Sequence, residues 1–461
     1  MTSTKSMSGS ARAWAGFQGG RDPYITLVSI YIFMPYVATV LIGDAVKGQS
    51  MIAGVALLGG LVAALTAPFL GAAADRIGRR KPALAVVSLL FSPAVFALWW
   101  AKPGGAGLGI PAILGLTLVI SLLFTYGEVL HNSLITVASR NERDAATMSG
   151  AALAAGNVVS VAALVFVLWA FALPGKVHWA GVPAAPLFGL DPALGEPSRI
   201  AAPIAALLFV IGVIPLLLFT RDAPAGAARA GAGAALAGGA RDLLALVRSV
   251  RHHRDAAIFL GARMLFSDAQ IALILFCGIY AAGVMHWGVL EMTAFGILMS
   301  AWAAVGGLLS SVLDRRLGPK RALQVEIVGT IAGIVALLGV SPEGMRFVFT
   351  VAPDAAPLWN GPVFTKAPEL VFLAIGGVVA VFNTAIFASS RTLLTRLIPP
   401  GQSGAFFGLF ALSATATVWL GPLAVKTAVA SFHSQQAGNV AIAILMALGF
   451  IPLCLVRDRQ A

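Results

Sequence analysis

The chain has 461 residues and a net charge of +12; 59% of its residues are apolar and only 11% are charged. A soluble protein is nearer half apolar and about one quarter charged, so this apolar excess excludes a single water-soluble globule. A helix that crosses a bilayer uses about 20 apolar residues, which leaves room for roughly a dozen spans and none for a large soluble catalytic domain.

Apolar stretches long enough to cross a bilayer form two groups of six along the chain. They are residues 25–43, 50–74, 83–101, 110–139, 147–173, 200–220, 256–283, 291–313, 322–340, 368–394, 405–430 and 438–456. We therefore predict an all-α polytopic membrane protein with twelve transmembrane helices in two pseudo-symmetric six-helix bundles. The expected divisions are a cytoplasmic N-terminal segment (1–24), bundles at 25–220 and 256–456, a linker (221–255) and a cytoplasmic tail (457–461).

The linker at 221–255 combines two kinds of sequence. Its first part is rich in Ala and Gly and has no hydrophobic face, which is typical of a flexible connection. Its last part, from Arg241 to Arg254, alternates leucine and valine with arginine at near-helical spacing. This basic amphipathic helix either lies on an anionic cytoplasmic leaflet or is a solvated linker helix.

Lysine and arginine are distributed unevenly between the loops. With the N-terminus inside, the cytoplasmic segments hold 23 basic residues and the outer segments hold 7, and Arg263 alone lies within a span. Because cytoplasmic loops carry an excess of Lys and Arg, this distribution places both termini in the cytoplasm. The positive charge is thus a signal of topology, and we expect no nucleic-acid partner.

Two loops at equivalent places in the two halves carry glycine, aspartate and arginine in a similar pattern. The first contains Gly71, Asp75, Arg76, Gly78, Arg79 and Arg80; the second contains Asp314, Arg315 and Gly318. Glycine permits close helix approach and tight turns, and an aspartate at a helix end can pair with arginine or with the N-terminus of another helix. Parallel repeats of six-helix halves are a transporter architecture with the substrate site between the halves.

The first of these loops resembles the signature of the major facilitator superfamily between spans 2 and 3. The resemblance implies that the loop stabilises the closed cytoplasmic side of the transporter, which makes both loops a cytoplasmic gate. The alternative is that the basic residues only hold the topology, and both roles are compatible.

Four further segments resemble the vacuole-effluxer-like branch of that superfamily. They surround Asn132 and cover 263–270, 389–399 and 404–409. Fungal members of the branch export amino acids from vacuoles, so the resemblance implies export of amino acids or small peptides. The chain departs from the family pattern at 21–24, where the family has Asp-Trp-Ala-Asn-Ser, and at Ala269, where glycine is usual.

Few polar groups lie at membrane depth, and each ionisable one is a candidate for function because an unpaired charge there is costly. We expect a central substrate and proton pathway lined by spans 1, 4, 7 and 10, with Tyr31, Tyr126, Glu128, Asn132, Arg263, Asp268, Gln270 and Asn383. Glu128 and Asn132 share a helix face, whereas Arg263 and Asp268 are roughly 140° apart and are not expected to pair. The alternative for the amides and tyrosines is that they link helices.

These features predict a secondary active transporter that moves a small solute by alternating access. A carboxyl group in a cavity of low dielectric can load and release a proton, so we expect the proton as coupling ion, through Glu128 or Asp268, and no other cofactor. Arg263 either binds an anionic group of the substrate or is a permanent counter-ion. A sugar or amphipathic-drug carrier of the same superfamily and a non-transporting membrane sensor are the alternatives.

Enzymatic chemistry is not expected from this sequence. It has no Walker loop, no His-Glu-x-x-His and no complete nucleophile elbow. Cys277 and Cys454 lie in apolar runs, so neither a disulfide nor a metal site is expected. The expected partners are a small-molecule substrate and the lipid bilayer, and the expected state is a monomer in the bacterial cytoplasmic (inner) membrane.

Overall fold

The structure, a computed structural model, describes residues 7–77, 80–139, 142–220, 222, 253–346, 348–352, 356–398 and 403–457. Twelve helices in this part of the chain are long and apolar enough to cross a membrane, which confirms the predicted number of spans. Most of the expected linker (221–255) and of the expected tail (457–461) lie outside the described residues.

The N-terminal half contains six spans. Span 1 comprises α1 (Gly9–Arg21), the π-helical turns η1 (Tyr24–Tyr31) and η2 (Val37–Leu41), and α2 (Phe33–Tyr36) between these turns. The others are α3 (Ala45–Ile77), α4 (Lys81–Ala97), α5 (Ile110–Ser133), α7 (Glu142–Val167) extended by η5 (Leu168–Ala172), and α9 (Ala201–Phe219). The short helices between them are η3 (Leu98–Trp100), η4 (Pro103–Gly105), α6 (Ile135–Ala138), η6 (Leu187–Gly189), η7 (Pro192–Leu194) and α8 (Glu196–Arg199).

The C-terminal half contains the other six spans. They are α11 (Arg254–Met285), α12 (Val289–Leu317), α13 (Pro319–Leu338), α14 (Ala367–Leu397), the pair α15 (Ser403–Thr415) and α16 (Leu420–Phe432), and α17 (Gln435–Leu455). Between α13 and α14 lies a small antiparallel sheet of β1 (Val340–Ser341), β2 (Gly344–Met345) and β3 (Phe349–Thr350), in the order β1-β2-β3.

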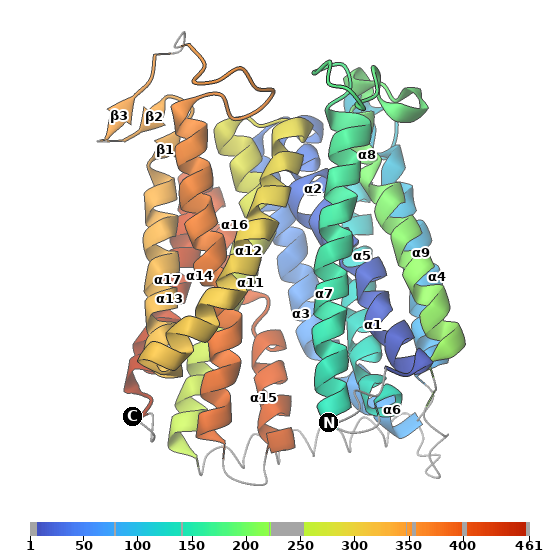
Figure 1. Cartoon of the computed structure of the whole chain (residues 1–461), viewed down its shortest axis with the longest axis vertical. Coiled ribbons are helices and arrows are strands. Elements are labelled where there is room, and N and C mark those ends of the chain that lie inside the picture. Colours follow the sequence, from blue (N-terminus) through green and yellow to red (C-terminus); the bar gives the residue numbers. More distant parts are fainter. Residues whose placement is uncertain are drawn as a thin grey trace.

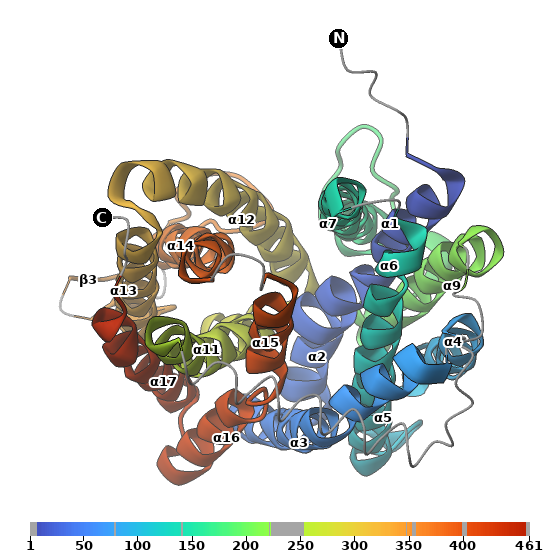
Figure 2. The same ribbon diagram turned by 90° about the horizontal axis from the view of Figure 1, so that it is seen from below.

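The two halves stand side by side in Figure 1, with the N-terminal half in blue and green and the C-terminal half in yellow to red. Across the boundary α3 packs against α16, α7 against α12, and η1 against α11, and Figure 2 shows the boundary from below. We call the lower end in Figure 1, where α17 ends, the terminal end, and the upper end with β1–β3 the loop end. An even number of spans brings both chain ends to one side, and the prediction that this side is cytoplasmic stays a prediction.

The first span begins at Gly9, earlier than the expected boundary at residue 25. Its polar residues made 1–24 resemble a soluble segment, but Gln18, Arg21 and Asp22 are bonded to one another inside the bundle. Asp22 accepts hydrogen bonds from Gln18 at 3.0 Å and from Arg21 at 3.1 Å. Because α1 also packs against α7 and α9, these groups are sheltered without losing their partners.

Span 11 is not the continuous helix expected for 405–430. The backbone turns at residues 416–419, between α15 and α16. Pro422 has no N–H to donate to the carbonyl of Val418, and its ring crowds that carbonyl, so a regular helix cannot run through this point. Gly421 adds backbone freedom, and this Gly-Pro pair was the sequence signal for the break.

Candidate functional site

A charged cluster joins spans 1 and 4 in the N-terminal half. Arg21 Nη2 lies 3.8 Å from Glu128 Oε1, and Arg21 Nε lies 3.1 Å from Asp22 Oδ1. The Arg21 side chain is 6% exposed, whereas that of Glu128 is 45% exposed. Arg21 Nη1 has no hydrogen-bond partner in the described part of the chain. The cluster therefore holds one cation and two carboxylates, of which the Glu128 carboxylate is the most exposed group.

Trp14 and His131 fix the geometry of this cluster. The Trp14 indole N–H donates to the His131 carbonyl at 2.8 Å, and His131 Nε2 lies 3.0 Å from the Trp14 carbonyl. The two rings stack with their centres 4.5 Å apart. His131 is fully buried. Since His131 follows Glu128 on the same helix, these contacts hold α5 in register with α1 and keep Glu128 beside Arg21.

The sequence placed Arg21 in the expected cytoplasmic segment (1–24), so its role in the site was not predicted. The available signal was the adjacent Arg21-Asp22 pair directly before the apolar run at 25–43. Glu128 itself lies toward the terminal end of α5, since that helix ends at Ser133 and not at residue 139.

The other predicted residues of the N-terminal half have separate roles. The hydroxyl of Tyr126 is 2.7 Å from that of Thr66, which links α5 to α3. Tyr31 packs across the boundary between the halves, with its ring 5.8 Å from that of Phe295. Asn132 is exposed. For the tyrosines these contacts favour the helix-linking alternative.

In the C-terminal half, the polar residues of α11 bind helices of the same half. Arg263 Nη1 donates to the Phe410 carbonyl and to Ser413 Oγ, both at 2.6 Å. Asp268 is fully buried, and its Oδ2 accepts from the Gly421 N–H at 2.7 Å. Arg263 and Asp268 form no ion pair in the part of the chain that is described, as their angular separation predicted.

Gln270 links α11 to α14. Its Nε2 donates to the backbone carbonyl of Asn383 at 2.8 Å, and Asn383 is 5% exposed. Thus the residues expected along one central pathway form two groups, and the hydrogen bonds described for each group stay within its own half. These side chains therefore contribute no hydrogen bond across the boundary between the halves in the described part of the chain.

A buried carboxylate in span 9 was missed. Glu326 on α13 is 0% exposed, and its Oε1 accepts a hydrogen bond from Ser389 Oγ at 2.8 Å. Its Oε2 has no partner among the described residues. The signal was present in the sequence, because Glu326 is the one acidic residue in the predicted span 322–340.

Part of the first predicted gate loop can be described. Arg80 is 9% exposed, and its guanidinium donates to the Ser133 carbonyl. The Asp222 carboxylate accepts from the backbone N–H groups of Arg80 at 3.1 Å and Lys81 at 3.2 Å, so it caps the start of α4. These contacts tie Arg80 to the N-terminal half.

The structure describes only part of the remaining predicted gate residues. Gly71, Asp75 and Arg76 belong to α3, but their side chains are not described, and Gly78 and Arg79 lie outside the described residues. In the second gate loop, Gly318 has φ of +77°, a conformation that favours glycine, between α12 and α13. Asp314 and Arg315 close α12, with Arg315 exposed. The role of these residues as a latch stays a prediction.

At the loop end the two halves are in direct contact. Gln435 Nε2 donates to Gln49 Oε1 at 2.8 Å, and the two residues are 4% and 0% exposed. Nearby, a side-chain carbon at Gly278 would lie 1.7 Å from the Ile30 carbonyl oxygen. The loop end is therefore closed by backbone approach and by a buried amide pair.

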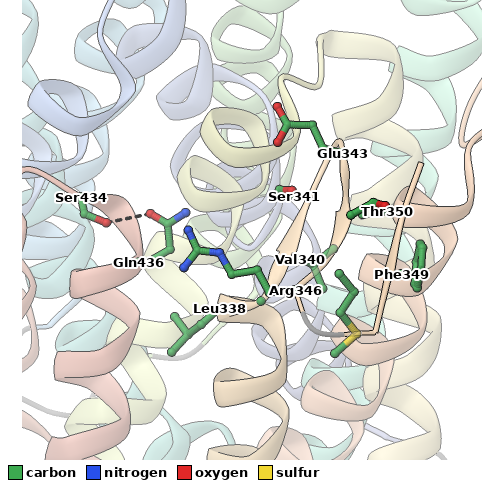
Figure 3. A pocket seen from close by; sticks show the side chains of 12 residues that line it. Leu338, Val340, Ser341, Glu343, Arg346, Phe349, Thr350, Ser434 and Gln436 are labelled. Atoms are coloured by element: carbon green, nitrogen blue, oxygen red, sulfur yellow. Dashed lines mark hydrogen bonds between the residues drawn. The ribbon is translucent and has the colours of Figure 1, made fainter. Parts of the chain in front are cut away.

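A separate pocket of about 460 Å³ also lies at the loop end, between the β1–β2 turn and the first turn of α17. Figure 3 shows Arg346 reaching toward Gln436, whose Oε1 is 2.7 Å from Ser434 Oγ. The pocket lies outside spans 1, 4, 7 and 10, so it shares no residue with the charged cluster.

Two pseudo-equivalent six-helix halves with polar groups between their helices define a twelve-helix fold of the major facilitator type. The chain is similar to the nucleoside transporter NupG (TM-score 0.61, 16% identity, 97% of this chain and 98% of that chain). It is also similar to the inward open xylose transporter XylE from E. coli (TM-score 0.59, 13% identity, 98% and 96%). At these identities the similarity concerns the fold.

The family described as "Vacuole effluxer Atg22 like" matches residues 38–461, so the chain belongs to this family. Autophagy-related protein 22 of Pichia angusta is 23% identical over 205 residues, which cover 44% of this chain and 33% of the relative. The protein of that name from Cryptococcus neoformans var. neoformans serotype D (strain JEC21) is 28% identical over 194 residues, 41% of this chain and 31% of the relative.

The matched stretch thus spans about a third of these curated relatives. The family and the structural neighbours are transporters and not enzymes, in agreement with the expectation from the sequence. The chain is an integral, multi-pass membrane protein. Because these relatives are fungal, they do not support the expected bacterial inner membrane.

Proposed function

We propose that the protein is a secondary transporter that moves a small solute by alternating access of its two halves. The observation that carries this proposal is the ion pair of Arg21 and Glu128, which joins two membrane spans and leaves the carboxylate 45% exposed. A charge at membrane depth is stable only beside a partner or a wet cavity, and Glu128 has a partner in Arg21.

The contacts between the halves support a state that is open toward the terminal end. Gln435 and Gln49 close the loop end, whereas Glu128, toward the terminal end of α5, is partly exposed. The excess of basic residues on the terminal side makes this side the cytoplasmic one. The proposed state is therefore one that faces the cytoplasm, and both chain ends lie there.

The charged cluster suits a zwitterion such as an amino acid or a small peptide. The guanidinium of Arg21 suits a solute carboxylate, and the carboxylates of Asp22 and Glu128 suit an ammonium group. Membership of an effluxer family supports the same substrate class and the direction of export. A sugar or amphipathic-drug carrier and a membrane sensor are the competing functions.

We propose the proton as coupling ion, with Glu128 as its first carrier. A solute carboxylate that binds Arg21 competes with Glu128 for the same guanidinium. Glu128 then loses its counter-charge and takes up a proton, which lowers the free energy of closing the cavity around it. Asp268 remains the second candidate carrier, since it is fully buried and carries one unpartnered oxygen.

Proteoliposomes test coupling directly. Solute-driven proton flux is measured for the wild type, Glu128→Gln and Asp268→Asn, with amino acids, dipeptides, sugars and cationic dyes as solutes. Glu343→Gln, an exposed carboxylate of the β1–β2 turn, serves as the matched control. Coupled flux that is undiminished in both variants contradicts the proposed coupling. Flux with sugars but not with amino acids favours the sugar carrier.

Topology and the gate are proposed on the same basis. A single cysteine introduced near either chain end is expected to react with a membrane-impermeant maleimide only after the cytoplasmic face is exposed. The latch proposed for Asp75, Arg76, Arg79 and Arg80 predicts that Asp75→Asn favours the state open to the cytoplasm. A monomer in detergent is expected by light scattering.

A further inference from the structure

Two residues of α11 bind the two pieces of the broken span 11. Arg263 contacts α15 through Phe410 and Ser413, and Asp268 contacts α16 through Gly421. The two residues are five positions apart on one helix, which places them about 7.5 Å apart along its axis. Their partners lie on opposite sides of the turn at 416–419.

The N–H groups at the start of α16 show what Asp268 supplies. Leu420 donates to the Thr417 carbonyl at 2.8 Å and Leu423 to the Trp419 carbonyl at 3.0 Å, while Pro422 has no N–H. The N–H of Gly421 is the remaining donor of the first turn, and Asp268 Oδ2 accepts it. A residue from a different span thus caps α16 in place of a local cap.

The close approach of α16 to α11 depends on glycine. A side-chain carbon at Gly421 would lie 2.7 Å from the Ala272 side chain and 3.0 Å from the Asp268 carbonyl oxygen. Any larger residue would therefore push α16 away from the carboxylate that caps it.

At the other side of the break, Arg263 binds the last turns of α15. Its guanidinium carbon also lies 3.5 Å from the centre of the Phe410 ring, and Thr417 Oγ1 donates to the Met264 carbonyl at 2.9 Å. A cation near the carboxyl end of α15 and an anion at the amino end of α16 each match the local helix dipole. This explains how two buried charges are stabilised without pairing with each other.

The break also contacts the opposite half of the protein. A side-chain carbon at Gly60 of α3 would lie 3.1 Å from the Trp419 backbone, and α16 packs along α3. In Figure 1, α15 extends from the break toward the terminal end beside the boundary between the halves. A change of angle at 416–419 would therefore move α15 relative to the N-terminal half.

We propose that Arg263 and Asp268 are positioning residues that set the angle between α15 and α16, and that the turn at 416–419 is the pivot about which α15 closes the terminal end. This inference rests on the proposed alternating-access function for its role in transport, but the positioning itself is independent of it. Arg263 holds the piece that moves, and Asp268 holds the piece that stays packed on α3.

Spin-label distances measure the angle in the purified full chain. Labels are placed at Phe407→Cys on α15 and Ile451→Cys on α17, both exposed, in a Cys277→Ala, Cys454→Ala background. Because both labels belong to the C-terminal half, the distance reports on α15 within its half and not on motion between the halves. Its distribution remains informative whether or not the protein transports a solute.

The expected result is a narrow distribution in the parent and a broad one in Asp268→Ala, Arg263→Ala and Gly421→Ala. Loss of a helix cap changes local equilibria by about tenfold, so a second distance population of this order is expected. Asp268→Asn keeps an oxygen that accepts the Gly421 N–H and is expected to restore the narrow distribution. Arg263→Lys is expected to restore it in part. Arg346→Ala, an exposed arginine of the loop-end pocket, is the control.

Unchanged distributions in Asp268→Ala, Arg263→Ala and Gly421→Ala overturn the proposal. So does an asparagine variant that is as broad as the alanine variant, because then Asp268 does not act as the acceptor for Gly421. In transport assays, positioning predicts an about tenfold lower maximal rate with a nearly unchanged KM for Arg263→Lys. If no transport is found but the distances behave as expected, the proposed function fails and the positioning role stands.

Discussion

The side chains of Gln435 and Gln49 form a hydrogen bond of 2.8 Å across the boundary between the two halves, at the loop end. Both residues are buried, and Gly283 and Gly438 leave the space that the two amides fill, since a side-chain carbon at either glycine would clash with them. Gln435 also lies 3.3 Å from the Ile279 carbonyl. A contact of this kind must break whenever the loop end opens.

Gln435→Leu is expected to favour the state that is open at the loop end. The change leaves the Gln49 amide buried without its partner, at about 1–3 kcal/mol, which shifts the equilibrium roughly tenfold or more. Ala282→Cys, one turn after Gly278 on α11, should then react faster with an external maleimide. Gln436→Leu is the control, because Gln436 accepts its hydrogen bond from Ser434, within its own half. Equal labelling rates in the two variants would contradict the role of the pair.

Gly278→Ala is expected to separate the halves at the loop end. The added carbon would lie 1.7 Å from the Ile30 carbonyl oxygen, so α11 and η1 cannot keep their present distance. We expect a strong loss of transport with a folded protein, measured by proteoliposome uptake and size-exclusion chromatography. Gly261→Ala on the same helix has open space around the new carbon and should retain the parent rate.

Arg21→Lys is expected to weaken the binding of solutes that have a free carboxylate by about tenfold. Lysine keeps the positive charge beside Asp22 but lacks the planar, forked guanidinium that can bind two carboxylates together. Calorimetry with an amino acid and its methyl ester checks this. The ester should bind the parent and the variant alike, and a similar loss for both ligands would mean that Arg21 does not contact the carboxylate.

Glu326→Gln is expected to leave the thermal stability unchanged or higher. The carboxylate is fully buried, accepts one hydrogen bond from Ser389 and has no ion-pair partner among the described residues. A neutral amide of the same shape keeps the acceptor without burying a charge. Thermal unfolding in detergent measures the difference, with Glu326→Leu as the variant that should lower the midpoint because it leaves the Ser389 hydroxyl unpaired.

The number of spans could be predicted from the sequence because crossing a bilayer is a local property of about 20 consecutive residues. The same holds for the turn at Gly318, where the backbone needs a conformation that glycine adopts easily. Angular spacing along one helix also predicted that Arg263 and Asp268 do not pair. The resemblance to the vacuole effluxer family was carried by short segments and is confirmed over residues 38–461.

The partners of the polar residues were decided by the tertiary structure alone. The sequence places Arg21 in a loop, whereas the structure places it beside Glu128, which is more than 100 residues away along the chain. Arg263 and Asp268 bind residues about 150 positions away, on the two sides of the break in span 11. In the sequence, Gly421 and Pro422 were the only signal of this break. A helix sequence determines that a segment can span a membrane, whereas the face that each polar group presents, and the group it meets there, depend on how twelve helices pack together.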